Sequence, residues 1–195
     1  MAYKGIAKEE KPMNTEIRRQ LVHASGILAI VPIYYLGKER SLLLLGAFLF
    51  LLLAMSNFRG KLFLLRSLEN FVKKFERTKE SPIRGALTFF SGCFIAVLVF
   101  PVELAIAGIS VLAVSDSLST VVGMSYGKHK VDFAPKKSWE GTVAFFLSAL
   151  FVLLYFMGWE KALLVAFLAS LIELIPHWDD NVVLPSAVAL LIQLL

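Results

Sequence analysis

Seven apolar segments, each near the length that crosses a lipid bilayer, constrain the fold of this chain more than any other feature. Hydrophobic residues make up 57% of its 195 positions, which is more apolar length than a soluble domain of this size can bury. The sequence therefore predicts an all-α, polytopic membrane bundle of about seven transmembrane helices. The predicted helices occupy residues 21–36, 42–58, 85–100, 104–124, 141–157, 162–175 and 182–195, in one domain (21–195) that follows a polar segment (1–20).

Basic residues are distributed unevenly over the connections between these segments. Of the twenty lysines and arginines, five precede the first segment, eight lie in residues 59–84 and four in residues 125–138, whereas three lie in connections on the other side. Because cytoplasmic loops are enriched in lysine and arginine, this bias predicts a multi-pass membrane protein whose N-terminus and longer connections face the cytoplasm. No cleavable signal peptide is expected, since the first apolar run follows twenty mostly polar residues.

The connection between the second and third segments carries an apolar stripe. Leu64, Leu68 and Phe75 recur at helical spacing opposite basic residues, which predicts an amphipathic helix at the cytoplasmic surface. Such a helix either packs on the bundle or gathers lipid. The single cysteine, Cys93, excludes an intrachain disulfide and is expected to pack in an apolar helix. No nucleic-acid partner is expected, because no basic patch carries interleaved aromatic residues.

A carboxylate lies inside the fourth apolar segment. Asp116 is costly there, because an acid at the centre of a membrane helix costs about 2.5–3.5 kcal/mol on insertion scales and is usually kept for a function. Thr120 and Gly123 follow on the same helical face, so the three residues are expected to border one cavity. A purely structural pairing of Asp116 with Lys136 or Arg84 is the alternative.

Other polar residues gather at the segment ends that the charge bias places in the cytoplasm. They are His23, Arg84, Glu140, Glu173, His177, Asp179, Asp180 and Asn181. Seven helices could have scattered such residues over two faces of a membrane. Their clustering predicts one site that is open both to a cytosolic nucleotide and to a lipid.

The residue types in this cluster point to phosphoryl or nucleotidyl transfer, which needs a divalent metal ion, acids that bind it and cations that offset phosphate charge. Asp116, Asp179 and Asp180 are the predicted ligands of Mg²⁺, which prefers oxygen. The predicted nucleotide contacts are Arg84, Gly123, Gly127, Lys128, Lys136, Lys137, Ser138 and Gly141, because lysines bind phosphates and glycines allow close backbone approach. The alternatives are that the lysines only set the topology and that residues 179–181 only cap the last helix.

Five short motifs follow one another along the chain. They are EIRRQLVH (residues 16–23), RGA (84–86), DSLSTVVGMSYGK (116–128), KKSWEGT (136–142) and ELIPHWDDNVVLP (173–185). Together they resemble the polyprenol kinase family, which contains dolichol kinase, phytol kinase and CTP-dependent diacylglycerol kinase and is distantly similar to the phosphatidate and archaeol cytidylyltransferases. The resemblance implies a Mg²⁺-dependent, CTP-using kinase that phosphorylates a lipid hydroxyl at the cytoplasmic face. The short chain suits a compact prokaryotic or archaeal member in the cell membrane.

The resulting hypothesis gives catalytic roles to Asp116, Lys137, Glu140 and His23. Lys136 and Lys137 would bind the triphosphate of CTP, Glu140 would orient a lysine or the metal, and His23 or an acid would take the proton of the acceptor hydroxyl. Glu173, Asn181 and Thr120 complete the predicted site. The acceptor would be a polyprenol, dolichol-like or related lipid within the membrane. His23 could equally be a hydrogen-bonded histidine at the membrane interface.

Two other functions use similar residues. A cytidylyltransferase that forms a CDP-lipid would attack the α-phosphate of CTP instead of the γ-phosphate. A proton-coupled transporter would use the buried acids as a relay, but it would need a polar path through both leaflets, and the outer halves of the predicted helices are apolar. The sequence leaves the oligomeric state open and is compatible with an oligomer.

Overall fold

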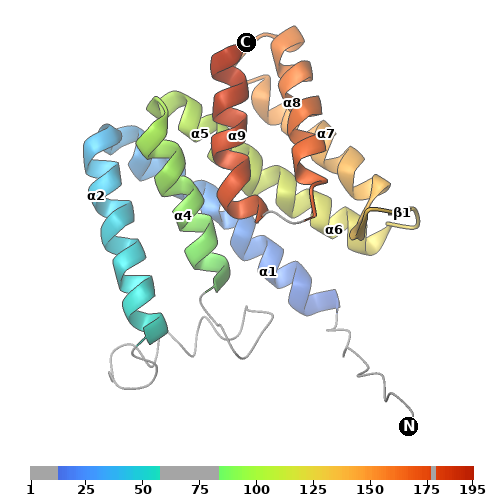
Figure 1. Cartoon of the computed structure of the whole chain (residues 1–195), viewed down its shortest axis with the longest axis horizontal. Helices are drawn as coiled ribbons and strands as arrows, with labels where there is room; N and C mark the ends of the chain where they lie inside the picture. Colours follow the sequence, from blue (N-terminus) through green and yellow to red (C-terminus); the bar gives the residue numbers. More distant parts are fainter. Residues whose placement is uncertain (1–12, 58–83, 177–178) are drawn as a thin grey trace.

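The structure, a computed structural model, describes residues 13–57, 84–176 and 179–195. Over these residues the chain forms a helical bundle with a small two-stranded sheet at one end (Figure 1). The amphipathic helix predicted around Leu64, Leu68 and Phe75 lies outside the described residues, and so does His177.

The helices lie close to the predicted segments. Their bounds are α1 Met13–Ser25, η1 Gly26–Ala29, α2 Ile30–Asn57, α4 Arg84–Val99, α5 Val102–Val111, η2 Leu112–Asp116, α6 Ser117–Ser125, α7 Trp139–Leu153, α8 Trp159–Glu173 and α9 Asp180–Leu194. The first helix begins earlier than predicted, so part of the polar segment 1–20 is helical. Helix α2 contains a sharp kink at Gly37, whose φ of 73° suits glycine, and this kink separates the first two predicted segments.

Two helical stretches, Arg19–Ser56 and Val102–Ser125, are long and apolar enough to cross a membrane. Large apolar side chains cover much of the described exterior, and Leu43, Phe50 and Phe151 are among the exposed ones. An apolar exterior of this kind is expected of a protein that contacts lipid. These observations support association with a membrane, whereas the number of transmembrane helices stays a prediction.

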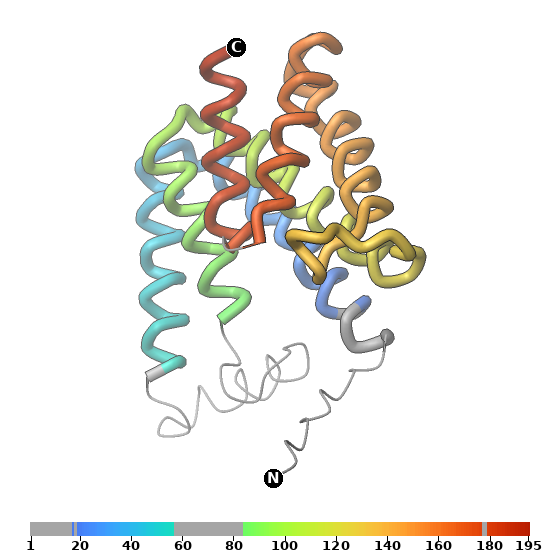
Figure 2. The backbone as a smooth tube through the Cα atoms, turned by 45° about the vertical axis from the view of Figure 1, so that its right-hand side comes forward, coloured from blue at the N-terminus to red at the C-terminus, as the bar shows by residue number. Residues whose placement is uncertain are grey.

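Helix α9 packs closely on its neighbours and lies between α4 and α8 (Figure 2). A Cβ atom at Gly92 of α4 would collide with the backbone carbonyl of Asn181, and one at Gly108 of α5 would collide with that of Pro185. Glycines at such crossings let helix backbones touch. The N-terminus of α9, where Asp180 lies, is thereby fixed against the centre of the bundle.

A β-hairpin connects α6 to α7, in a region where the sequence predicted only a lysine-rich loop. Strands β1 (Lys130–Val131) and β2 (Ala134–Ser138) pair antiparallel. The hairpin is anchored by Val131 and Ala134, which are buried together with Leu174 just beyond α8. The prediction of an all-α fold is therefore incomplete by this one element, whose strands are too short to produce a readable alternation of apolar and polar residues.

Candidate active site

Asp116 lies at a local irregularity of the helix that carries it. The turn η2 is a π-helical turn that joins α5 to α6, and Asp116 is its last residue. Single π-turns within α-helices occur frequently at functional sites. As the sequence predicted, Asp116, Thr120 and Gly123 line one cavity, which has a volume of about 1650 Å³.

Three carboxylates meet in this cavity. Oxygen atoms of Asp116, Glu173 and Asp180 all lie within 4.8 Å of one another. These residues come from η2, the C-terminus of α8 and the N-terminus of α9. We call them the acid cluster. The packing of α9 on α4 and α5 brings Asp180 to Asp116 and Glu173.

Asp179 has a different environment from that of the acid cluster, although it was predicted as a metal ligand. Its side chain is exposed and accepts a hydrogen bond of 3.2 Å from the backbone N–H of Asn181. This is the contact of an N-cap residue at the start of α9. The described structure thus groups Glu173, rather than Asp179, with Asp116 and Asp180.

Lys137, the penultimate residue of β2, reaches into the acid cluster. Its Nζ lies 3.0 Å from Oε1 of Glu173 and 2.8 Å from Oδ2 of Asp180, and it also donates to the backbone carbonyl of Glu173. Burial alone would lower the pKa of Lys137, but the charges of Glu173 and Asp180 outweigh burial and raise it. Lys137 is therefore a fixed positive charge inside the cavity.

One lysine does not neutralise three carboxylates. Burial raises the pKa of Asp180 to about 7, because Lys137 offsets only part of this effect and the charges of Asp116 and Glu173 oppose ionisation further. Oε2 of Glu173 is buried and has no hydrogen-bond partner among the described residues, whereas Oε1 accepts a bond of 3.4 Å from Ser119. The three carboxylates thus outnumber the one lysine paired with them, and they offer only oxygen ligands, which fits a hard divalent cation such as Mg²⁺.

His23, on α1, adjoins the acid cluster. Its Nε2 lies 3.3 Å from Oδ2 of Asp116, and both side chains are largely buried. The imidazole also packs edge-to-face on Phe89 of α4, with ring centroids 5.1 Å apart. His23 therefore stands where the polar part of the cavity meets its apolar part.

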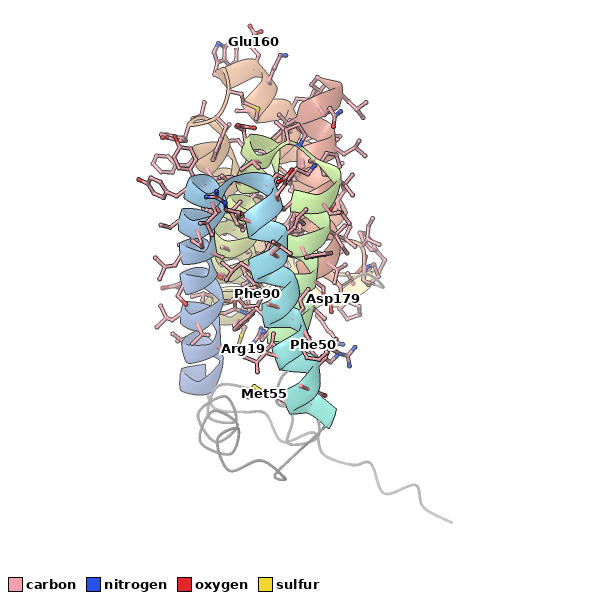
Figure 3. All side chains as sticks on the ribbon, turned by 90° about the vertical axis from the view of Figure 1, so that its left-hand side faces the viewer. Arg19, Phe50, Met55, Phe90, Glu160 and Asp179 are labelled. Atoms are coloured by element: carbon pink, nitrogen blue, oxygen red, sulfur yellow. The ribbon has the colours of Figure 1, made fainter. Side chains whose placement is uncertain are left out.

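The cavity has a polar side and an apolar side. The predicted site residues that line it are His23, Arg84, Asp116, Thr120, Gly123, Lys136, Lys137, Ser138, Gly141, Glu173, Asp179, Asp180 and Asn181. Arg19 and Lys130, which were not predicted as binding residues, also line it. Figure 3 faces the α1–α2 side of the molecule and labels Arg19, Phe90 and Asp179, three of the lining residues.

Glu140 points to the hairpin and is not among the residues that line the cavity. Its carboxylate accepts hydrogen bonds of 3.1 Å from the backbone N–H groups of Lys128 and His129 and lies 2.7 Å from Nδ1 of His129. Hydrogen bonds to its own backbone and to these two residues lower the pKa of Glu140 to about 2. Glu140 therefore fixes the start of the hairpin, and among the described residues no hydrogen bond or ion pair joins it to a lysine side chain or to the acid cluster.

The glycines predicted to contact nucleotide have packing partners. A Cβ atom at Gly141 would lie 2.9 Å from the backbone oxygen of Ser119 and 3.3 Å from Cα of Gly123, so both glycines allow α6 and α7 to touch. A Cβ atom at Gly127 would approach Ser138 Oγ to 2.5 Å. Ser138 is the N-cap of α7 and accepts the N–H of Gly141 at 3.2 Å. Their predicted nucleotide contacts stay predictions.

Two site contacts were not foreseen from the sequence. Ser119 donates to Glu173, and Thr88 on α4 accepts a bond of 3.1 Å from the side-chain amide of Asn181. Ser119 lies three residues after Asp116, which places both on one helical face and is the signal that could have identified it. Thr88 had no such signal, because its partner is distant in the sequence.

Several proteins with similar sequences are named as lipid kinases. The chain is 34% identical to a probable phytol kinase of maize over 140 residues, which are 62% of this chain and 46% of the maize protein. It is 27% identical to phytol kinase 1 of Arabidopsis thaliana over 59% of this chain and 44% of that protein. It is 25% identical to CTP-dependent diacylglycerol kinase 1 of Schizosaccharomyces pombe over 57% of this chain and 60% of that one.

These relatives confirm the resemblance to the polyprenol kinase family that the five motifs indicated. The chain spans about half the length of the plant relatives it matches. No protein-family model matches the chain, and no solved structure matches it.

Proposed function

Taking the chain as a homologue of these kinases, we propose that it transfers the γ-phosphoryl group of CTP to the hydroxyl of a polyprenol-like lipid alcohol, with Mg²⁺ as cofactor. The observation that supports this most directly is the acid cluster with Lys137, which lies in a cavity that also has an apolar side. Phosphoryl transfer depends on such groups, because its catalysis rests on positioning and on electrostatic stabilisation of the phosphates.

Asp116, Glu173 and Asp180 would hold Mg²⁺. When bound there, Mg²⁺ would supply positive charge that stabilises the phosphates during the transfer. The cations of the chain would bind the rest of the triphosphate, and Arg84, Lys130 and Lys136 line the same cavity. Lys137 would balance the acid cluster and offset charge on the transferred group.

His23 would accept the proton of the lipid hydroxyl. A general base must lie within hydrogen-bond reach of the proton it takes, and His23 stands between the acid cluster and the apolar side of the cavity. Asp116, whose Oδ2 lies 3.3 Å from Nε2 of His23, would keep the imidazole oriented. Phe89 packs edge-to-face on the imidazole ring.

The decisive experiment for this function uses CTP labelled separately at the α and γ phosphates. Purified protein is incubated with Mg²⁺, labelled CTP and a panel of polyprenols and diacylglycerols, and the lipid products are separated. We expect the γ label in a lipid monophosphate. The α label in a CDP-lipid would show a cytidylyltransferase instead, and absence of label from every lipid alcohol would contradict the proposal.

The chain would span the membrane several times, with the cavity at the cytoplasmic end. Exposed tyrosine and tryptophan side chains, which favour membrane interfaces, lie near both ends of α7. Tyr155 and Trp159 lie in and beside the connection between α7 and α8, and Tyr126 and Trp139 border the hairpin connection between α6 and α7. Seventeen of the twenty basic residues belong to the N-terminal segment and to the connections 59–84 and 125–138. This bias is the reason for proposing that these regions, and the cavity with them, face the cytoplasm.

Single cysteines test this orientation. The only native cysteine, Cys93, is buried, so labelling by an impermeant thiol reagent in intact cells reports the introduced residue. We expect Lys161→Cys to be labelled and Ser125→Cys to be shielded until the membrane is permeabilised. The reverse pattern would place the cavity on the outer face.

A further inference from the structure

Asp180 lies in the first turn of α9, and the direction of its carboxylate depends on how that turn is seated. Successive residues of an α-helix point about 100° apart, so a rotation of the turn would carry the carboxylate away from Glu173 and Lys137. The N-cap bond from Asn181 to Asp179 closes the turn on itself, and it does not tie the turn to a neighbouring helix. A directional bond to another helix would prevent the rotation.

Asn181 attaches the first turn of α9 to α4 at two points. Its side-chain Nδ2 donates to Oγ1 of Thr88 at 3.1 Å. Its backbone carbonyl lies against Gly92, where a Cβ atom would collide with it. Thr88 and Gly92 are four residues apart and therefore lie on one face of α4. The two contacts are thus separated by about one turn of α4.

The two attachments differ in how firmly they fix the turn. In a regular α-helix the carbonyl of Asn181 would accept from the N–H of residue 185, but that residue is Pro185 and has no N–H. The carbonyl packs on Gly92 instead, and a contact of this kind supplies at most a weak Cα–H···O bond. It permits close approach without setting the rotation. The bond to Thr88 is the directional one of the two.

The Thr88 hydroxyl has its own reason for accepting this bond. It donates to the carbonyl of Gly85 at 3.2 Å, and a hydroxyl has only one proton to give. Towards Asn181 it therefore acts as an acceptor, so Asn181 must present its amide nitrogen. Thr88 lines the cavity one turn beyond Arg84. The bond thus joins the helix that carries a predicted phosphate contact to the helix that carries Asp180.

We propose that Thr88 is a positioning residue for the acid cluster. Through Asn181 it fixes the rotation of the first turn of α9 and so holds the carboxylate of Asp180 towards Asp116 and Glu173. This inference rests on the proposed function, in which the acid cluster binds Mg²⁺, and adds to it a residue that acts through Asn181. Groups that orient the ligands of a metal ion affect its affinity strongly, because they hold the ligand atoms in place.

The binding of Mn²⁺ alone tests this role. Mn²⁺ is titrated into the purified full chain in detergent, without nucleotide or lipid, and the free ion is measured by electron paramagnetic resonance. Thr88→Val removes the hydroxyl and leaves the Asn181 amide without this acceptor, so we expect the Kd for Mn²⁺ to rise about tenfold. Thr88→Ser keeps the hydroxyl and should bind as wild type does. Ser110→Ala is the control, because it removes a buried hydroxyl that donates to Ile106 of its own helix, and it should also bind as wild type does.

A double-mutant cycle distinguishes action through Asn181 from a general loosening of the bundle. Asn181→Ala removes the same bond from the side of α9 and should weaken Mn²⁺ binding to a similar degree. Adding Thr88→Val to Asn181→Ala should then cause little further loss, because the bond is already absent. Losses that multiply in the double variant would overturn the inference, and so would equal losses in Thr88→Val and Thr88→Ser. If Thr88→Val does not fold, full Mn²⁺ affinity in Asn181→Ala would overturn it alone.

The Mn²⁺ titration separates this inference from the proposed function, because it involves no phosphoryl transfer. Transfer of the γ label by a protein whose Mn²⁺ affinity is unchanged in Thr88→Val would refute the positioning role and leave the kinase in place. The expected Mn²⁺ pattern in a protein that labels no lipid would refute the kinase and leave the positioning role. A wild-type protein that binds no Mn²⁺ would refute the positioning role together with the proposed metal site.

Discussion

The two sides of the cavity are built by different forces. The polar side joins the acid cluster to Lys137 through ion pairs of 2.8 and 3.0 Å and to Ser119 through a hydrogen bond of 3.4 Å. The apolar side includes Phe48, Phe89 and Phe90, which are joined to one another and to His23 by ring contacts with centroids 4.5–5.3 Å apart. Directional bonds fix atoms to fractions of an ångström, whereas packing fixes a shape and tolerates substitutions that conserve volume. Changes on the polar side should therefore affect turnover, and changes on the apolar side should affect the choice of lipid acceptor.

The largest effect on turnover is expected at Glu173, which belongs to the acid cluster. The residue for comparison is Asp179, which caps α9. Glu173→Gln should lower turnover about 100- to 1000-fold, because it removes a charge that stabilises the reacting phosphates. It should also weaken binding of Mn²⁺, measured as a spectroscopic substitute for Mg²⁺. Asp179→Asn keeps a side chain that can cap α9 and should cost little. Equal losses in the two variants would break the distinction between the acid cluster and the cap.

Lys137 and Lys136 are neighbours with different contacts. Lys137 is ion-paired within the acid cluster, whereas Lys136 lines the cavity. Lys137→Gln leaves Glu173 and Asp180 without their cation, and breaking a buried pair costs about 3–5 kcal/mol. We expect a lower thermal midpoint and turnover reduced some tens of times, on the basis of this loss. Lys136→Gln should raise KM for CTP modestly, since Lys136 is exposed. Similar mild losses in both, recovered at low ionic strength, would reduce the two lysines to a general attraction of nucleotide.

The contact between α6 and α7 is tested by a pair of glycines. Gly141→Ala places a Cβ atom 2.9 Å from the backbone of Ser119, whereas at Gly158 nothing lies within 4 Å of the new atom. Gly141→Ala should destabilise the protein by about 1–3 kcal/mol, as overpacking does, and should reduce turnover because α6 continues directly from Asp116. Gly158→Ala should do neither. Thermal unfolding in detergent measures both, and a stable, active Gly141→Ala would show that the two helices can separate freely.

The smallest effect is expected at Glu140, compared with Glu160, which is labelled at the top of the bundle in Figure 3. Both acids follow a tryptophan in the first turn of a helix. Glu140→Gln weakens the contacts with Lys128 and His129, so the hairpin that carries Lys137 is held less firmly. We expect KM for CTP to rise a few-fold with kcat little changed, on the basis of weakened charge-assisted hydrogen bonds. Glu160→Gln should have no effect on either constant, and a large fall in kcat for Glu140→Gln would restore the catalytic role predicted from the sequence.

Much of the architecture could be predicted because it depends on local patterns. The helix bounds and the shared face of Asp116, Thr120 and Gly123 follow from apolar run length and helical periodicity. One cavity lined by residues from distant motifs was also predictable, because these residues all lie at segment ends on the same predicted side of the membrane. These inferences need no knowledge of which helices touch.

The parts that escaped prediction depend on contacts between distant segments. Asp179 and Asp180 look equivalent in the sequence, and only the seating of α9 on Gly92 and Gly108 decides which carboxylate turns inward. Glu140 looked catalytic because it lies near two lysines, but its partners are backbone N–H groups that the hairpin presents. The hairpin itself depends on burial of Val131 and Ala134 near Leu174, which no local pattern reveals.

The π-helical turn that ends at Asp116 sets the direction of this side chain by the number of its residues, independently of which residues they are. Such a turn holds one residue more than an α-helical turn, and each residue of an α-helix rotates the next side chain by about 100°. Deleting any one residue between Leu112 and Ser115 would convert the turn to regular helix and swing Asp116 away from Glu173 and Asp180. The orientation of this carboxylate is thus encoded in chain length, so a single-residue deletion there would be more damaging than most substitutions at the same positions.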